Sequence, residues 1–538
     1  MPVIQSAIDP NGREFAANRA LHLKLIDQLR ELERKVDEAS TRSEVKFSER
    51  GQLLPRQRIQ RLLDRDMPFL ELSTLAGLGM HEDDAITTVL GGGNIAGIGF
   101  VSGIRCALFV NDSGIKGGAL SPMGISKALR IQAIAIENKL PFIQLVESAG
   151  ANLLMQSEQF VPGGGLFANL ARMSAAGQPV IAIVHGSSTA GGAYQIGLAD
   201  YVILVRGRSK VFLAGPPLLR AATGEIADDE SLGGTEMHAT VSGLGEYVAE
   251  NDVHALGIAR ELLSKLSWPG RGVRRPDQFE PPLYDSDELV GVVPADYRKP
   301  YDVREVIARV VDGSDFLEFK PLFDAYTICG HAAIEGRSVG ILGNNGPITA
   351  AGARKATQFI QLCCQTGTPL LFLQNTTGFI VGVEAERAGI VKEGSKMIQA
   401  VTNANVPKVT IQIGAAFGAG YYAMCGRAFG PRFVFGWPNR RLAVMGGEQA
   451  SRVLTLVAED AAKRKDIEPA HDRLEQQGRK VREAFETEST AWFATARLWD
   501  DGLIDPRDTR RIVAFCLDTC DDGDRRVLRS TSFGVARM

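Results

Sequence analysis

The chain has 538 residues, of which 45% are hydrophobic and 58 are glycine, and its formal net charge at pH 7 is −3. At roughly 100–200 residues per domain, this length predicts about two to four domains. The excess of glycine favours α/β architecture with many tight turns. The slightly acidic balance argues against a protein that binds nucleic acid or a membrane surface, because such proteins usually carry a basic patch.

The seven cysteines include no Cys-x-x-Cys pair, and most lie in apolar segments. Their odd number and their setting predict buried free thiols and a reducing compartment. The N-terminus lacks the basic region and apolar core of a secretory signal. No apolar run reaches about 18 residues, so we predict no transmembrane helix.

The first predicted element is a helix over residues 14–38, where apolar residues recur at three- and four-residue spacing. It packs either on its own domain or, as an arm, on a neighbouring subunit. Residues 95–215 then alternate apolar strands with helical stretches, which is the rhythm of βαβ units with helices on both faces of a sheet. We expect strands at 106–110, 142–146, 180–184 and 201–205, and helices at 124–138, 166–176 and 190–199.

The second half follows a Pro-rich, charged segment, residues 268–283, which predicts a linker. Residues 325–450 repeat the pattern of the first core. Residues 452–488 predict a long charged helical stretch, and residues 507–520 predict a closing helix.

The two cores are copies of each other. Residues 127–150 match residues 355–378 at a constant offset of 228, and residues 189–194 match residues 418–423 at an offset of 229. Solenoid repeats have periods of roughly 20–50 residues. A period this long therefore indicates a duplicated domain.

Each copy places a Gly-rich turn between a buried strand and a helix. The first turn spans residues 185–189 and precedes a helix that opens at 190–193. The second spans residues 414–417 and precedes a helix that opens at 418–420. Small residues at a helix N-terminus leave backbone N–H groups free to hold a negatively charged oxygen. Two such turns predict a reaction with two oxyanions. The alternative is that the glycines only allow close packing of strand and helix.

Other kinds of site are poorly supported. Residues 418–423 fit G-x-G-x-x-A, but the acidic residue that a dinucleotide fingerprint requires about 20 positions later is missing. The sequence contains no Walker-type phosphate loop and no G-x-S-x-G nucleophile elbow. The seven histidines lack metal-ligand spacing, so we expect no metal. Glu147 and Glu448 lie near the turns, where they serve either acid–base chemistry or structural pairing.

Four long segments resemble a known family: residues 212–225, 299–306, 444–450 and 496–505. They are similar to the carboxyltransferase (β) subunits of biotin-dependent acyl-CoA carboxylases, and the resemblance covers nearly the whole chain. They look closest to the methylcrotonoyl-CoA and geranyl-CoA branch, rather than the propionyl-CoA branch. The resemblance implies an α/β fold of two tandem crotonase-like (ββα superhelix) domains with flanking helices, over residues 18–274 and 275–532.

The resemblance also implies which backbone groups act. A first oxyanion hole, matching Gly191 and Gly192, holds the enolate of an acyl-CoA thioester. A second, matching Ala419 and Gly420, holds the ureido oxygen of biotin. The propionyl-CoA branch has Gly-Ala at the second hole, but the donor is a backbone N–H, so the swap keeps the chemistry possible. Tyr422 matches a position that helps to shape the acyl pocket.

The implied reaction removes a proton from the γ-carbon of a branched α,β-unsaturated acyl-CoA, and the biotin anion left by CO2 release serves as the base. Methylcrotonoyl-CoA enzymes usually carry His-Phe-Gly-Arg where this chain reads Pro162-Gly163-Gly164-Gly165, and the next aromatic pair becomes Phe167-Ala168. The lost ring predicts room for a longer acyl chain beside Gly163 and Ala168. We therefore expect geranyl-CoA, from acyclic terpene catabolism, as the substrate. If the glycines form only a flexible loop, the alternative is 3-methylcrotonoyl-CoA, from leucine catabolism.

The chain has no biotin-accepting Ala-Met-Lys-Met segment and no ATP-binding signature. The resemblance therefore implies a separate α subunit that carries biotin and the biotin carboxylase activity, a β6 core within an α6β6 complex, and a bacterial cytoplasmic location. A crotonase-type hydratase or isomerase is a remote alternative, since such enzymes use paired carboxylates and need one domain copy. A non-catalytic scaffold predicts drift in one of the turns, which the sequence does not show.

Overall fold

The computed structural model describes residues 3–80, 89–152, 155–269, 278–294, 296–465 and 471–536. The chain folds as two compact units. The N unit comprises residues 31–274, 496–498 and 518–538, and the C unit comprises residues 1–30, 275–495 and 499–517.

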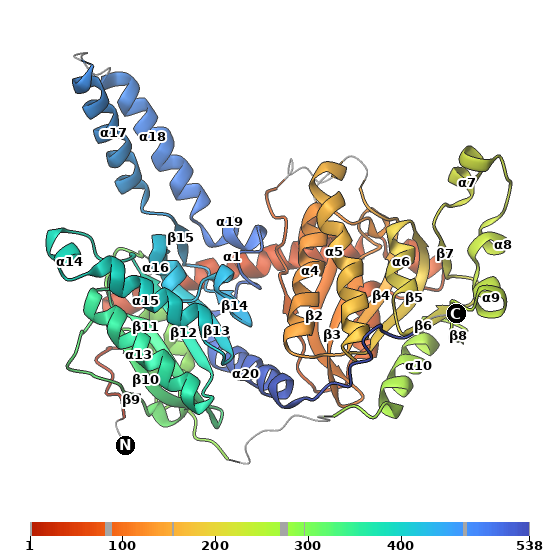
Figure 1. Ribbon diagram of the computed structural model, residues 1–538, viewed down its shortest axis with the longest axis horizontal. Coiled ribbons are helices and arrows are strands. Elements are labelled where there is room, and N and C mark those ends of the chain that lie inside the picture. The colour runs from red at the N-terminus through yellow and green to blue at the C-terminus, as the bar shows by residue number, and fades with distance from the viewer. Residues whose placement is uncertain are drawn as a thin grey trace. The chain divides into compact units, whose positions relative to one another are not determined.

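The N unit contains one sheet and the helices that cover it (Figure 1). Its strands are Leu70–Leu72 (β1), Asn94–Val101 (β2), Ile104–Asn111 (β3), Phe142–Ser148 (β4), Val180–Thr189 (β5), Tyr201–Val205 (β6), Lys210–Phe212 (β7) and Tyr247–Ala249 (β8). Its helices are Glu44–Glu49 (α2), Pro55–Leu62 (α3), Pro122–Glu137 (α4), Gln156–Ala175 (α5), Gly191–Gly197 (α6), Pro216–Thr223 (α7), Asp229–Gly233 (α8), Thr235–Met237 (α9) and Asp252–Lys265 (α10).

The C unit repeats this plan. Its strands are Leu317–Glu318 (β9), Thr327–Ile334 (β10), Arg337–Asn344 (β11), Leu370–Thr376 (β12), Lys408–Phe417 (β13), Phe433–Gly436 (β14) and Arg441–Ala443 (β15). Its helices are Leu289–Val292 (α11), Arg304–Ala308 (α12), Ala350–Thr366 (α13), Val383–Arg387 (α14), Ile390–Asn403 (α15), Gly418–Ala423 (α16), Gly447–Arg464 (α17) and His471–Glu488 (α18). Helices Arg13–Thr41 (α1), Ala491–Ala496 (α19) and Thr509–Arg525 (α20) contribute residues to both units.

Among the described residues the two sheets share one strand order, except that the N-unit sheet has an additional parallel strand, β8, beyond β6. In the N unit β1, β2 and β3 are antiparallel, and β3, β4, β5, β6 and β8 run parallel. In the C unit β9, β10 and β11 are antiparallel, and β11 to β14 run parallel. Parallel neighbours require crossover connections, which the intervening helices provide. The α/β fold in two copies is therefore confirmed.

The strand before each turn is longer than the sequence predicted. We expected a turn over residues 185–189, but β5 continues to Thr189, because its first half pairs with β6 and its last three residues pair with β7. In the C unit β13 likewise continues to Phe417, pairing first with β14 and then with β15. Each turn therefore begins at the end of a strand whose last three residues are still paired with a neighbouring strand.

The N-unit core lies between the sheet and the pair α3 and α10. Its buried apolar side chains come from alternate positions of the parallel strands, among them Ile143, Leu145, Ile181 and Ile183. This alternation places each strand's intervening residues on the other face of the sheet. The opposite face of the sheet, away from α3 and α10, is covered by α4, whose buried side chains include Ile131 and Ile134 (Figure 1).

Most other predicted elements are confirmed. The helix over 14–38 lies within α1, and the closing helix corresponds to α20. The stretch 452–488 is two helices, α17 and α18, and residues 466–470 between them lie outside the described residues. Residues 270–277 of the predicted linker also lie outside them.

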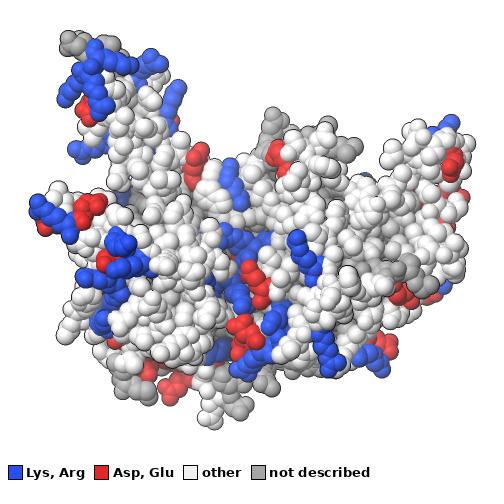
Figure 2. Space-filling model, viewed as in Figure 1, with Lys and Arg blue, Asp and Glu red and all other residues white. Residues whose placement is uncertain are grey.

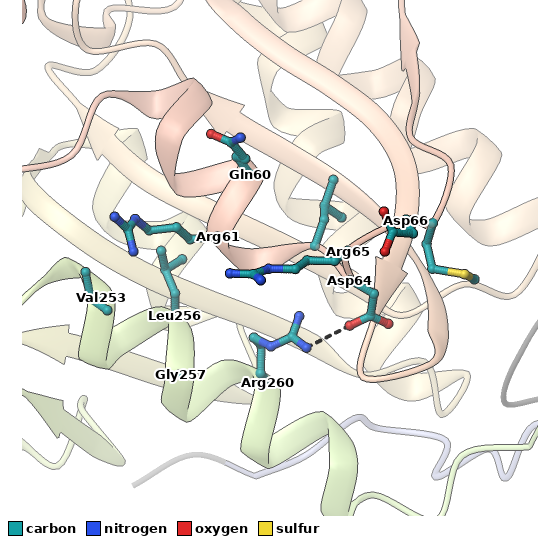
Figure 3. Close-up of a pocket in the computed structure, with 11 residues that line it drawn as sticks. Gln60, Arg61, Asp64, Arg65, Asp66, Val253, Leu256, Gly257 and Arg260 are labelled. Carbon is teal, nitrogen blue, oxygen red and sulfur yellow. Dashed lines mark ion pairs between the residues drawn. The ribbon is translucent and has the colours of Figure 1, made fainter.

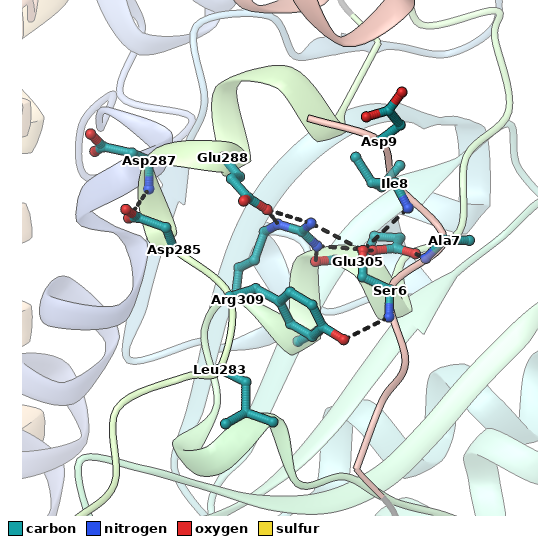
Figure 4. Close-up of polar contacts among 12 residues, drawn as sticks. Ser6, Ala7, Ile8, Asp9, Leu283, Asp285, Asp287, Glu288, Glu305 and Arg309 are labelled. Atoms are coloured by element: carbon teal, nitrogen blue, oxygen red, sulfur yellow. Dashed lines mark hydrogen bonds and ion pairs between the residues drawn. The ribbon is translucent and has the colours of Figure 1, made fainter. Parts of the chain in front are cut away.

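The first residues of the chain are fastened to the C unit by a polar cluster (Figure 4). Glu305 accepts hydrogen bonds from the Ser6 hydroxyl at 2.6 Å and from the Ala7 N–H at 2.7 Å. Arg309, whose side chain is fully buried, donates to Ser6 and to Glu288. The Tyr284 hydroxyl accepts from the Ser6 N–H. These bonds make residues 3–9 an integral part of the C unit.

Acidic and basic side chains are mixed over the face shown in Figure 2, and basic residues gather at the end of α17, where Lys463 and Arg464 occupy its last turn. Among the helices that the structure describes, none is long and apolar enough to cross a membrane.

Candidate functional site

The first Gly-rich turn is a strained link between β5 and α6. Ala190, which joins them, has a φ of +51°. A non-glycine residue in this region is uncommon and costs on the order of 1–3 kcal/mol, and such strain clusters at functional sites. Ala190 is held there by a hydrogen bond from its N–H to the Phe212 carbonyl of β7.

This turn leaves two backbone donors open. The Gly191 and Gly192 N–H groups have no hydrogen-bond partner within the described ranges, whereas the next N–H, that of Ala193, bonds to the Ala190 carbonyl. Both open groups belong to the first turn of α6, where the helix dipole favours negative charge. The arrangement suits an anionic oxygen.

The second turn has the same geometry at an offset of 228 residues. Gly418, at the position that matches Ala190, has a φ of +56°. The Ala419 and Gly420 N–H groups in the first turn of α16 likewise lack partners among the residues that the structure describes. The offset of 229 that the sequence suggested for this region is wrong by one residue, because repeated glycines and alanines allow either alignment. The structure fixes it through the shared backbone conformation.

Each turn rests on a hydroxyl that the sequence analysis missed. Ser148 at the end of β4 accepts a hydrogen bond from the Gly150 N–H at 3.1 Å and donates to the Gly118 carbonyl at 3.1 Å. Thr376 at the end of β12 makes the matching bonds with Gly378 and Gly346, both at 3.2 Å. The 228-residue repeat also relates Ser148 to Thr376, so these two hydroxyls could have been identified from the sequence.

These supports explain why both turns contain glycine. A Cβ on Gly192 would lie 3.3 Å from the Ser148 Cβ. A Cβ on Gly420 would lie 2.7 Å from the Gly378 Cα and 3.1 Å from the Thr376 Cγ2, so the backbone would have to move. Gly420 is therefore required by close approach of two backbone segments, and Gly192 is nearly so.

The outer residues of the turns have more room. Ala419 is exposed. A Cβ on Gly191 would lie 3.3 Å from the Phe167 Cζ of α5. Phe167 in turn packs edge-on against Tyr194, with ring centroids 6.1 Å apart. The first turn is therefore flanked by two aromatic rings.

Tyr422, which the sequence analysis selected, is half-exposed and packs on Phe429 and Tyr421, with centroid distances of 5.5 and 5.7 Å. It is matched in the N unit by Tyr194, at an offset of 228 residues. The sequence analysis did not single out Tyr194. Each copy thus places a half-exposed tyrosine in the helix that opens at the turn.

Gly163 and Ala168 lie in helix α5, so the loop expected at residues 163–165 is wrong. A Cβ on Gly163 would lie 3.7 Å from the Ile125 Cδ1 of α4, and one on Gly165 would lie 3.0 Å from the Leu129 Cδ2. Gly165 lets the two helices pack closely, whereas a Cβ on Gly163 would make only an ordinary van der Waals contact. The packing of α5 on α4 overrides the poor helix propensity of these glycines. Gly163 is four residues from Phe167, so both lie on one face of α5. Ala168 follows Phe167 and is half-buried.

The two carboxylates that the sequence analysis placed near the turns are Glu147 and Glu448. Glu147 accepts a hydrogen bond from Arg58 at 3.0 Å. Glu448 lies in the first turn of α17. Within the described ranges no three His, Cys, Asp or Glu side chains form a group that could hold a metal ion. His81 lies outside the described residues, as does the side chain of His471.

A large groove in the N unit is distinct from the turns (Figure 3). It has a volume of about 1220 Å³ and lies between α3 and α10, with Arg61 and Arg65 extending into it. Asp64, which pairs with Arg260 at 2.8 Å, also accepts from Ser102 and Gly103 in the hairpin between β2 and β3. That hairpin precedes β3, so the groove lies at the amino ends of the parallel strands. Gly191 follows the carboxyl end of β5, at the opposite edge of the sheet.

Residues 46–531 match the carboxyl transferase domain family. The chain belongs to this family. The crystal structure of the P. aeruginosa geranyl-CoA carboxylase beta subunit is similar over 100% of both chains, with 54% sequence identity and a TM-score of 0.92. This similarity confirms the expected fold of two crotonase-like domains.

Two curated relatives are also similar over most of their length. A probable biotin-dependent acyl-CoA carboxylase beta2 subunit of Mycobacterium tuberculosis is 46% identical over 100% of both chains. The biotin-dependent 3-methylcrotonyl-CoA carboxylase beta1 subunit of the same organism is 45% identical over 91% of this chain and 92% of that one. The predicted family is thereby confirmed.

Proposed function

We propose that this chain is the carboxyltransferase (β) component of a biotin-dependent acyl-CoA carboxylase that acts on geranyl-CoA. The observation that carries this proposal is the full-length similarity to the P. aeruginosa geranyl-CoA carboxylase beta subunit, at 54% identity. The two turns with open N–H groups supply the chemistry that such a reaction needs.

The Gly191 and Gly192 N–H groups stabilise the thioester oxygen as it becomes an enolate. The Ala419 and Gly420 N–H groups stabilise the ureido oxygen of biotin. Preorganised donors of this kind act without reorganisation, and losing one typically costs roughly 10²–10³ in rate. Carboxybiotin, carried by the partner subunit, supplies both the carboxyl group and the base that removes the γ-proton. The described turns accordingly need no catalytic carboxylate.

The acyl chain runs along the face of α5 that carries Phe167 and Gly163. Phe167 lies beside Gly191, and Gly163 is one helical turn away on the same face. A residue without a side chain there leaves room for the extra isoprenoid unit of geranyl-CoA, with Ala168 adding little bulk. Tyr422 borders the pocket from the second copy.

A second candidate substrate is 3-methylcrotonoyl-CoA. It is favoured by the 45% identity to the mycobacterial 3-methylcrotonyl-CoA carboxylase beta1 subunit. The close packing of Gly165 on α4 also gives this glycine a structural purpose that is independent of substrate length.

The proposal includes a biotin-bearing α subunit with biotin carboxylase activity and a β6 core within an α6β6 complex. Active sites then form between the first domain of one subunit and the second of another. The free cysteines, six of them buried, suit a reducing bacterial cytoplasm.

The test is carboxylation by the purified chain together with its biotinylated partner, ATP and bicarbonate. We expect kcat/KM for geranyl-CoA to exceed that for 3-methylcrotonoyl-CoA. The reverse order would select the second substrate. Hydration or isomerisation of an enoyl-CoA by this chain alone, without biotin, would instead identify a crotonase-type enzyme and overturn the proposal.

A further inference from the structure

Four ionisable side chains form a linear hydrogen-bonded network inside the N unit. Arg58 of α3 donates from Nη1 to Glu147 of β4 and from Nε to Asp252 of α10, both at 3.0 Å. Asp252 also accepts from the Nδ1 of His185 in β5 at 2.8 Å. The exposed fractions of these side chains are 1% for Arg58, 12% for Glu147, 3% for Asp252 and 0% for His185.

The backbone reinforces this network. The Leu53 N–H donates to Asp252 at 2.8 Å, and the Gln52 amide donates to the His185 carbonyl at 2.8 Å. A carboxylate can only accept, so His185 carries its proton on Nδ1. Burial and the charge of Arg58 lower the pKa of His185, which keeps the imidazole neutral.

Such a network is an uncertain source of stability, because desolvation of buried ions offsets their attraction, and apolar replacements are often neutral or stabilising. The duplicated fold supplies an internal comparison. At an offset of 228 residues, Glu147 and His185 are matched by the neutral residues Asn375 and Ile413. Asn375 packs against Gly414 as Glu147 packs against Gly186. The C unit therefore lacks the charges of Glu147 and His185. The buried guanidinium that contacts its strand β13 belongs to a different network, in which Arg440 donates to Gln412 and to Asp500.

The network is attached directly to the strands that carry the first turn. Glu147 precedes Ser148, which bonds Gly150 and lies against Gly192. His185 lies in β5, which ends at the turn. Arg58 holds Glu147 of β4 directly, and it holds His185 of β5 through Asp252. The guanidinium thus fixes the carboxyl ends of two neighbouring strands relative to each other.

We propose that Arg58, Asp252, His185 and Glu147 act as positioning residues for the first oxyanion hole, and that the second hole does not depend on them. This inference rests on the proposed function, because it assigns the two holes to different parts of the reaction. Loss of the network should displace the Gly191 and Gly192 N–H groups slightly and leave the C unit unchanged.

The experiment compares two activities of the full chain bound to its biotinylated partner. One is carboxylation of geranyl-CoA, which needs both holes. The other is loss of CO2 from carboxybiotin without acyl-CoA, in which biotin takes up a solvent proton and which needs only the second hole. In Glu147→Gln we expect kcat/KM for geranyl-CoA to fall roughly tenfold or more, since small misplacements of reacting groups carry large rate penalties. Loss of CO2 should stay at the wild-type rate.

The matched control is Asp522→Asn. It breaks another ion pair of the N unit, the one between Asp522 of α20 and the buried Arg105 of β3 at 2.9 Å. We expect Asp522→Asn to keep wild-type kcat/KM at a similar loss of melting temperature. Arg58→Lys keeps the positive charge, but an ammonium group cannot replace the two hydrogen bonds that the guanidinium donates to Glu147 and Asp252. We expect its kcat/KM and its rate of CO2 loss to resemble those of Glu147→Gln.

Equal losses in Glu147→Gln and Asp522→Asn, or equal losses of both activities in Glu147→Gln, would overturn the inference. If Glu147→Gln does not fold, Arg58→Lys is measured with the same expectation. An inactive wild-type complex would instead contradict the proposed function, so the two failures are distinguishable.

Discussion

The two Gly-rich turns reach one backbone geometry with different residues. The first turn puts Ala190 at a positive φ and the second puts Gly418 there. The hydroxyl beneath the turn is Ser148 in one copy and Thr376 in the other. The outer donor belongs to Gly191 in the first copy and to Ala419 in the second. What both copies share is a positive φ before the helix and two N–H groups that have no hydrogen-bond partner among the described residues. This shared feature supports the proposal that backbone groups, rather than side chains, bind the two oxyanions.

The comparison also grades the need for glycine at matched positions. A Cβ on Gly420 would lie 2.7 Å from the backbone at Gly378, whereas a Cβ on Gly192 would come no closer than 3.3 Å to Ser148. Substitutions at matched positions should therefore differ in size, and four predictions use this difference or extend it to the rest of each unit.

The largest effect is expected for Gly420→Ala. The new Cβ would lie 2.7 Å from the Gly378 Cα, so the turn must shift and a donor is lost, which typically lowers the rate by roughly 10²–10³. The matched variant Gly192→Ala has a closest approach of 3.3 Å and should lose less. Turnover of geranyl-CoA in both variants is the measurement. A larger loss of turnover in Gly192→Ala than in Gly420→Ala would contradict the conclusion that the second turn is the more tightly packed one.

The next effect concerns substrate length. Gly163→Phe should reduce carboxylation of geranyl-CoA more than that of 3-methylcrotonoyl-CoA, because a ring on this face of α5 would occupy the space for the longer chain. Overfilling a packed site typically costs about 1–3 kcal/mol. The ratio of the two kcat/KM values tests this, with Gly164→Phe as control, since a Cβ on Gly164 has no atom within 4 Å. An unchanged ratio would leave the glycines as helix-packing residues only.

The third prediction contrasts the units under acid. Burial lowers the pKa of His22, in the C unit, to about 4 from an unfolded value of 6.5. The unfolded chain therefore binds this proton first, and stability that is present above pH 6.5 is lost as the pH falls towards 4. At pH 5 this single group contributes a loss of about 2 kcal/mol. His22→Gln should flatten the decline in C-unit stability between pH 7 and 5, measured by hydrogen exchange; an unaltered slope would assign the decline to other groups.

The smallest effect is expected at the strained link. Ala190→Gly relieves the positive φ but adds freedom to the unfolded chain, so these terms, each of about 1 kcal/mol, nearly cancel. The matched variant Gly418→Ala introduces the strain and places a Cβ 3.0 Å from the Val444 carbonyl, so it should destabilise by about 1–2 kcal/mol. Chemical denaturation of both variants compares them. Equal changes in the free energy of unfolding of the two variants would mean that the backbones of the two turns also differ.

Local patterns in the sequence predicted the repeat, the parallel strands and the turns, because these depend on short-range periodicity and on glycine. The network of Arg58, Glu147, His185 and Asp252 could not be predicted, since its members meet only when α3 and α10 pack on the sheet. Helix α5 was misread as a loop near Gly163, because its stability comes from packing on α4 rather than from its own residues. The supporting Ser148 and Thr376 were within reach through the repeat.

The central proposal is that the first turn binds the enolate oxygen and the second binds the ureido oxygen of biotin. It is tested most directly with Gly191→Val in the complex with the biotinylated partner. A Cβ on Gly191 has only the Phe167 Cζ within 4 Å, at 3.3 Å, so we expect the fold to survive while the side chain fills the space for the enolate oxygen. We predict that carboxylation of geranyl-CoA falls at least roughly a hundredfold, while loss of CO2 from carboxybiotin without acyl-CoA and the melting temperature stay near wild type. Near-normal carboxylation in this variant would contradict the account.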